Sequence, residues 1–313
     1  MKRDTQLTKI RISTGTLLIL LFCVFQSGLA QQKTQFTQYM FNGIVINPAY
    51  AGADEALSIT AVYRSQWTGM KNAPATQALS AHSLFKQKKL GLGLTLVNDK
   101  IGVHSNKSIL SQYAFHLPTS THSTLSFGMQ AGIYNLKSNY ASLRSSANDP
   151  LVYDPFLSRT FFDVGAGLYY RSRRFHAGLS VPEIIPQRFS FNDTLSIELS
   201  KMNLFLFSKY RFTLNNFFDL EPSVLVKHLR GVPTSFDVNL SAIYREVLVL
   251  ALSYRKDESI DFLLKMQINR QLQLGYSYDH TIGILAPIAN GSHELCVNYI
   301  FRDIQQKVVS PRR

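Results

Sequence analysis

The sequence offers one close pair of residues that could do nucleophilic chemistry, Ser80 and His82. A histidine base beside a serine hydroxyl is the arrangement that lipid-hydrolysing enzymes use, with a third group orienting the histidine. The pair has no such third group at a fixed offset, so it gives catalysis little support. Four other histidines have neither the spacing of metal ligands nor a carboxylate at a set distance: His104, His116, His122 and His176. We therefore expect no enzyme activity and no metal site.

A second candidate for chemistry is Gly91-Leu92-Gly93, which faintly resembles a nucleotide-binding loop. Such a loop opens a helix, and no helical pattern follows this one. Glycines inside an alternating strand ordinarily relieve crowding on the inner face. We therefore expect no cofactor.

The first thirty residues have the pattern of a secretory signal peptide. A basic stretch, an apolar run over 17–25 and the small residues Gly28-Leu29-Ala30 follow one another in the order that signal peptidase requires. The apolar run is too short for a spanning helix, which needs roughly 20 residues. The bulky Phe22 argues against lipid attachment at Cys23. We predict a signal peptide at 1–30, cleavage after Ala30 and export of the mature chain.

Net charge and cysteine content bear on possible partners and on disulfide bonding. The chain carries 33 basic and 20 acidic residues, a net charge of +13. Removing the signal takes away four basic residues and Asp4, which leaves about +10. An exported chain seldom meets nucleic acid, so we expect no nucleic-acid partner. Cys296 alone remains after cleavage, which excludes an intramolecular disulfide.

After residue 56 the chain alternates apolar and polar residues in runs of about ten, the length of a tilted membrane strand. We count fourteen runs, at 57–66, 76–85, 90–97, 107–117, 125–134, 162–171, 175–181, 203–213, 218–229, 236–245, 247–254, 260–268, 272–278 and 293–301. An even number is typical of a bacterial outer-membrane barrel. The pattern predicts an all-β, transmembrane antiparallel barrel of about 14 strands over 57–301. A water-soluble β-sandwich would alternate in the same way and stays open as an alternative.

Loop lengths and aromatic residues favour the barrel. Links after even-numbered runs are short, as periplasmic turns are, and several links after odd-numbered runs are long, such as 135–161 and 182–202. Runs directed inward end on aromatic residues suited to the lipid headgroup region: Phe85, Phe115, Tyr170, Phe212, Tyr244 and Phe301. Charged residues then face the lumen, among them Arg64, Asp163, Lys227, Asp237, Asp261, Asp279 and Glu294.

Three groups of residues are candidate contact sites. The leader at 31–56 is neither signal nor alternating strand; its candidates are Phe36, Tyr39, Met40, Phe41, Asn47, Pro48, Tyr50 and Gly52. A Gly- and Pro-containing turn holds the only tryptophan; its candidates are Arg64, Trp67, Gly69 and Pro74. The inner turns are basic, at Lys86, Lys88, Lys89, Arg173, Arg174 and Arg270. Trp67 suits either a membrane-interface anchor or a partner contact, and the basic turns suit either lipid headgroups or an acidic periplasmic partner.

Several motifs in one order resemble the PorP/SprF family. They are Phe36-Thr37-Gln38-Tyr39-Met40-Phe41-Asn42, Asn47-Pro48-Ala49-Tyr50-Ala51-Gly52, Tyr63-Arg64-x-Gln66-Trp67-x-Gly69, Gly91-Leu92-Gly93 and Val97-Asn98-Asp99-Lys100-Ile101-Gly102. The basic tail at 302–313 departs from the family pattern. The resemblance implies an outer-membrane component of the type IX secretion system of Bacteroidetes. Its implied partners are periplasmic secretion components and an exported protein such as a gliding adhesin.

The function hypotheses follow from these readings. The leading one is a non-catalytic component of protein secretion, and the alternatives are a general porin for small solutes and a lipid enzyme using Ser80 and His82. The apolar residues of the leader must pack somewhere, because burying each is worth roughly 1.5–3 kcal/mol. We predict that the leader closes the lumen as a plug; the alternative is that it lies along a periplasmic partner.

Overall fold

The computed structural model describes residues 35–85, 87, 89–139, 156–185, 187–190, 196–200, 202–229 and 232–301. The predicted signal peptide, its cleavage site, the basic tail, Lys86 and Lys88 lie outside these residues. No helix among the described residues is long and apolar enough to cross a membrane.

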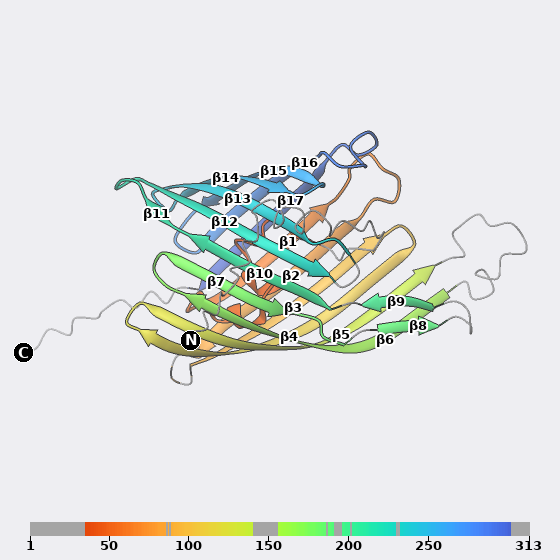
Figure 1. The fold of residues 1–313 in the computed structure, drawn as a ribbon, viewed down its shortest axis with the longest axis horizontal. Helices are drawn as coiled ribbons and strands as arrows, with labels where there is room; N and C mark the ends of the chain where they lie inside the picture. The colour runs from red at the N-terminus through yellow and green to blue at the C-terminus, as the bar shows by residue number, and fades with distance from the viewer. Residues whose placement is uncertain are drawn as a thin grey trace, which may run out of the picture.

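The wall is a closed antiparallel barrel of fourteen strands, as the alternation predicts (Figure 1). Its elements are β1 (Leu57–Ser65), β2 (Ala75–Phe85), β3 (Leu90–Ile101), β4 (His104–Ser120), β5 (Ser123–Asn139), β6 (Phe156–Arg171), β7 (Phe175–Val181), β10 (Asn203–Tyr210), β11 (Phe212–Thr213), β12 (Phe218–Leu229), β13 (Ser235–Tyr244), β14 (Leu248–Arg255), β15 (Ser259–Gln267), β16 (Leu272–Thr281) and β17 (Ser292–Phe301). β10 and β11 both pair with β12 and form one wall strand interrupted at Arg211.

Closure joins the first strand to the last. β1 pairs with β17 from Leu57 opposite Phe301 to Ser65 opposite His293, and β10 bridges β7 and β12. One end of the barrel therefore carries both ends of the wall and the short turns, and we call it the short-turn end. The other is the long-loop end. In outer-membrane barrels the short turns face the periplasm.

The outer face of the wall is apolar and the inner face is polar, as a membrane barrel requires. Outward apolar side chains are exposed, with Met129 at 69%, Ile109 at 57% and Phe262 at 55%, whereas Arg64 is 1% exposed and Glu294 0%. A water-soluble sandwich would bury its apolar face, so the exposed apolar belt excludes that alternative. Predicted headgroup aromatics at the short-turn end lie on the exposed face: Phe85, Phe115, Phe212, Tyr244 and Phe301.

Two features of the strands differ from expectation. β4, β5 and β6 are longer than their predicted runs, because their ends carry polar residues on both faces and the alternation fades there. The predicted loop at 182–202 contains a separate two-stranded sheet, β8 (Gln187–Ser190) with β9 (Ser196–Ser200).

Candidate functional site: the leader inside the barrel

The described part of the leader, residues 35–56, lies inside the barrel and joins β1 at Leu57 (Figure 1). It contains two short 3-10 turns, η1 (Gly43–Val45) and η2 (Pro48–Tyr50). The second turn packs against the inner faces of β4, β5 and β6. The leader thus occupies the space that would be the aqueous pore of an open barrel.

Local sequence chemistry shapes the second turn. Asn47 is extended, with φ −146° and ψ 114°, which is the geometry favoured before a proline. Its side-chain oxygen accepts the Ala49 N–H at 2.9 Å, and its amide donates to the Leu168 carbonyl at 2.8 Å. Asn47 therefore caps the turn and ties it to β6. Gly52 then reverses the chain with φ +84°.

At the long-loop end the leader completes a buried ionic cluster of Arg64, Asp279 and Glu294, which we call the Arg64 cluster. The guanidinium lies 2.7 Å from an Asp279 oxygen and 3.2 Å from a Glu294 oxygen. The Glu294 carboxylate accepts the backbone N–H groups of Thr37 and Gln38 at 2.8 and 2.9 Å. The Thr37 hydroxyl lies between Arg64 and Asp279, 2.7 Å from each. The leader thus supplies hydrogen-bond partners to buried wall charges, where an unpaired charge is costly.

The middle of the leader is held by aromatic packing. Tyr39 meets Phe207 of β10 edge to face at 6.2 Å, and its hydroxyl accepts a hydrogen bond from Asn239 at 2.8 Å. Burial, with the nearby Asp237 carboxylate adding to it, raises the pKa of Tyr39 above its usual value, so the phenol stays protonated. The Phe41 ring lies 4.7 Å from the Lys265 ammonium, a cation–π distance.

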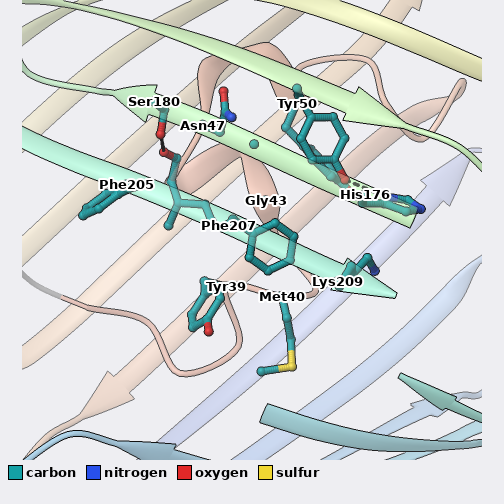
Figure 2. Close-up of a pocket in the computed structure, with 13 residues that line it drawn as sticks. Tyr39, Met40, Gly43, Asn47, Tyr50, His176, Ser180, Phe205, Phe207 and Lys209 are labelled. Atoms are coloured by element: carbon teal, nitrogen blue, oxygen red, sulfur yellow. Dashed lines mark hydrogen bonds between the residues drawn. The ribbon is translucent and has the colours of Figure 1, made fainter. Parts of the chain in front are cut away.

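A small cavity remains between the leader and the β7–β10 wall (Figure 2). Tyr39, Met40 and Phe207 group at its centre, with Lys209 and His176 on one side and Ser180 and Phe205 on the other. The polar groups around it are already engaged: Lys209 pairs with Glu221 at 3.0 Å, and the Tyr169 hydroxyl contacts His176 at 2.8 Å. The cavity is therefore a packing gap between the leader and the wall.

Glycines on the inner wall make room for the leader. A Cβ atom on Gly91 would lie 1.9 Å from the Ala51 carbonyl oxygen, and one on Gly128 would lie 2.1 Å from the Ala49 nitrogen. Both distances fall inside van der Waals contact with backbone that cannot rotate away. Further pairs of wall glycine and leader residue are Gly93 with Ile44, Gly167 and Gly178 with Asn47, and Gly275 with Gln38. These glycines form a groove that fits the leader backbone.

At the short-turn end, His82, His116 and Arg171 bind the last part of the leader. His82 accepts the Gly52 N–H at 3.1 Å, and His116 lies 2.8 Å from the Ala51 carbonyl oxygen. Arg171 donates to the Ala53 carbonyl and pairs with Glu55 at 2.7 Å. The leader is therefore fixed at both ends of the lumen.

Ser80 and His82, the candidate catalytic pair, both contact the leader. The Ser80 hydroxyl exchanges hydrogen bonds with the Asn42 amide, at 3.0 and 3.2 Å. The other ring nitrogen of His82 faces Asp54 at 3.5 Å. Each side chain is thus engaged by a different leader residue.

The remaining predicted site residues divide into those on the leader and those near the loops. Phe36 packs against Val62, Ala78 and Cys296, and the Tyr50 ring contacts His82 and Tyr169. Pro48 is buried in the second turn. That any of these leader residues binds a partner stays a prediction.

The tryptophan turn lies at the long-loop end, apart from the middle of the leader. The Trp67 backbone donates to Ser292, and the Thr68 N–H donates to the Gly291 carbonyl at 2.8 Å. Gly69 adopts φ +91° beside Asn290, and the Pro74 carbonyl accepts the Gln66 N–H. The turn is thus joined to the β16–β17 loop, and Arg64 alone of this group contacts the leader among the described residues.

The basic turn residues that the structure describes gather at the short-turn end. Lys89, Arg173, Arg174 and Arg270 are all exposed there. Both readings of these turns, contact with lipid headgroups and contact with an acidic partner, stay predictions.

Sequence reasoning missed the wall partners of the leader: Asp279 and Glu294 were assigned only to the lumen, and Arg171 and His116 were assigned no leader contact. One signal could have found part of this site. Glycines recur at inward positions of strands β3, β5, β6, β7 and β16, where barrel walls normally carry side chains. Inward glycines opposite one another indicate that another backbone lies against the wall.

Comparison with known proteins decides the family. The family model of the type IX secretion system membrane protein PorP/SprF matches residues 28–299. The chain belongs to the PorP/SprF family. The resemblance drawn from the motifs is therefore confirmed, and this PorP/SprF protein is an outer-membrane component of the type IX secretion system. No curated protein sequence matches the chain significantly.

Solved structures similar to this PorP/SprF protein are outer-membrane barrels of low sequence identity. The P. putida toluene transporter TodX has a TM-score of 0.46 at 9% identity, covering 82% of this chain and 93% of its own. The CymD monoaromatic hydrocarbon channel has 0.45 at 11%, covering 83% and 93%. The KdgM porin has 0.41 at 8%, covering 78% and 99%.

Proposed function

We propose that this PorP/SprF protein is a non-catalytic secretion component whose barrel is closed by its own leader, and that it supports the export or anchoring of cell-surface proteins such as gliding adhesins. Its partners would be periplasmic secretion components and the exported protein itself. The observation that carries the proposal is the leader, which contacts the wall from the Arg64 cluster to Arg171. A general porin needs an aqueous lumen of fixed width, and a bound leader is an obstacle to that role.

The polar contacts between the leader and the wall support a stably closed barrel. Four charged or histidine side chains of the wall bind leader backbone directly: Glu294, Arg171, His82 and His116. The bonds to the charged Glu294 and Arg171 contribute roughly 1.5–3 kcal/mol each. Several such bonds together would keep the leader bound until a partner offers competing contacts.

The first test is the conductance of the purified protein in planar lipid bilayers. We expect the full chain to be silent and a chain lacking residues 35–52 to conduct ions, because the deletion removes the segment that fills the lumen. Adding a synthetic peptide of residues 35–52 should lower the conductance again. A silent leaderless barrel, or a full chain that conducts like a porin, would contradict leader closure.

The second test addresses secretion in cells. We expect cells lacking the protein to lose an exported surface protein from the outer membrane, while uptake of small solutes is unchanged. Affinity capture of the tagged protein should recover periplasmic secretion components. Normal export together with reduced solute uptake would support the porin alternative. A measurable hydrolysis that Ser80→Ala or His82→Ala abolishes would instead support the enzyme alternative.

A further inference from the structure

The leader follows a single direction through the lumen. The residues that bind it can be placed by their register on β1, which runs from Leu57 at the short-turn end to Ser65 at the long-loop end. Gly52 binds His82, which pairs with Ser58, and Asn42 binds Ser80, which pairs with Thr60. Thr37 binds Arg64 itself. From Gly52 to Thr37, the positions that bind the leader thus move from the short-turn end to the long-loop end.

The amino end of the described leader lies almost at the end of the wall. Gln35 accepts a hydrogen bond from Lys227, which also pairs with Asp237 at 2.7 Å. Lys227 stands two residues before Leu229, where β12 ends, which is about 7 Å of strand. Gln35 therefore lies at the mouth opposite to the one where the leader joins β1.

The anchoring contacts oppose reversal of this direction. Glu294 accepts two consecutive backbone N–H groups, those of Thr37 and Gln38, and Gln38 also donates to the Glu294 carbonyl at 3.1 Å. At the other end Glu55 pairs with Arg171, the last residue of β6. Reversing the leader would leave the buried Glu294 carboxylate without these N–H donors, and a buried charged group that loses its hydrogen-bond donors is destabilising.

We propose that the leader crosses the whole lumen and brings Gln35, its first described residue, to the cell-surface mouth of the barrel. Short turns face the periplasm in outer-membrane barrels, so the long-loop end faces outward. The sequence predicts a plug that starts from the periplasmic mouth, where the strand that follows begins, and does not indicate how far the plug reaches. The wall contacts instead bring Gln35 to the outer mouth. A surface protein would then meet the amino end of the leader directly. The inference holds whatever substrate the protein serves.

The test is an epitope inserted directly before Gln35 and probed with antibody on intact cells, since an antibody does not cross the outer membrane. Two matched insertions calibrate the assay, one between Lys71 and Asn72 at the long-loop end and one between Asn269 and Arg270 at a short turn. We expect the leader epitope to bind antibody on intact cells as the Lys71 insertion does. Binding only after the outer membrane is permeabilised, as for the Asn269 insertion, would overturn the proposal.

A second readout covers the case in which the epitope blocks folding. In a Cys296→Ala background, Gln35→Cys should react with a large polyethylene glycol maleimide added outside intact cells. Lys71→Cys and Arg173→Cys serve as the outer and inner controls. Reaction of Gln35→Cys only in permeabilised cells would again contradict surface presentation. Conductance of the same variants distinguishes surface presentation from leader closure. A barrel that is silent but has Gln35 on the periplasmic side would contradict surface presentation and would still support leader closure.

Discussion

Replacing Arg64 with alanine is expected to release the amino half of the leader and to open the barrel to ions. The guanidinium is the single cation of the Arg64 cluster, and its loss leaves the carboxylates of Asp279 and Glu294 buried together. Removing one partner of a buried ion pair costs about 3–5 kcal/mol. One leader contact would be lost directly, because the Thr37 hydroxyl accepts a hydrogen bond from the same guanidinium. The measurements are bilayer conductance and the temperature at which the folded band disappears in gel electrophoresis.

Arg211→Ala is the matched control for this experiment. Arg211 also pairs with carboxylates, at 3.3 Å from Glu221 and 3.1 Å from Glu246, but at the short-turn end and without a leader contact in the described structure. We expect that variant to stay closed. A triple variant of Arg64→Ala, Asp279→Asn and Glu294→Gln removes the buried charges, so it should recover stability and still conduct. If Arg64→Ala is as silent and as stable as Arg211→Ala, the leader is not held by this cluster.

Gly128→Ala is expected to displace the second turn of the leader although it adds only a methyl group. That methyl group would lie 2.1 Å from the Ala49 nitrogen, 2.4 Å from its Cα and 2.5 Å from the Pro48 carbonyl carbon. All three are backbone atoms of a turn capped by Asn47, so the turn has to move as a unit. Overpacking of this kind costs about 1–3 kcal/mol. Proteolysis of the leader and bilayer conductance would both report the displacement.

The control lies on the same strand and the same face. At Gly132 the nearest atom to an added methyl group is Leu110 Cδ2 at 2.4 Å, the end of a side chain that can change rotamer. Gly132→Ala should therefore leave the leader protected and the barrel silent. Equal effects of the two substitutions would indicate a general weakness of β5 instead of a leader groove.

The wall could be predicted from sequence because lipid imposes one rule on every strand. Where lipid covers one face, apolar side chains must alternate with polar ones, as Leu90 to Leu96 do in β3. The rule ends where the lipid ends. His104, Ser105 and Asn106 extend β4 beyond the predicted run with polar residues only, and pairing with β3 on one side and β5 on the other holds them in the sheet.

The leader could be predicted as a buried segment that closes the lumen, but its contacts with the wall could not. Its aromatic residues required burial, but which wall residues bind it depends on side chains brought together by the closed barrel. Glu294 illustrates the reason. Its position in β17 predicts a lumen-facing charge, yet its pairing with Arg64 and with the Thr37 backbone depends on the register between the first and last strands. No local pattern in the sequence encodes that register.

The contact between Thr37 and Glu294 also constrains the order of assembly. The two residues are 257 positions apart, and Glu294 lies on the last strand to be synthesised. The leader is made first but cannot find its anchoring carboxylate until β17 has paired with β1. Contacts this distant in sequence form late and slowly during folding. Before β17 pairs with β1, the aromatic leader has no anchoring carboxylate and stays undocked. Docking of the leader is therefore a late step that depends on closure of the barrel.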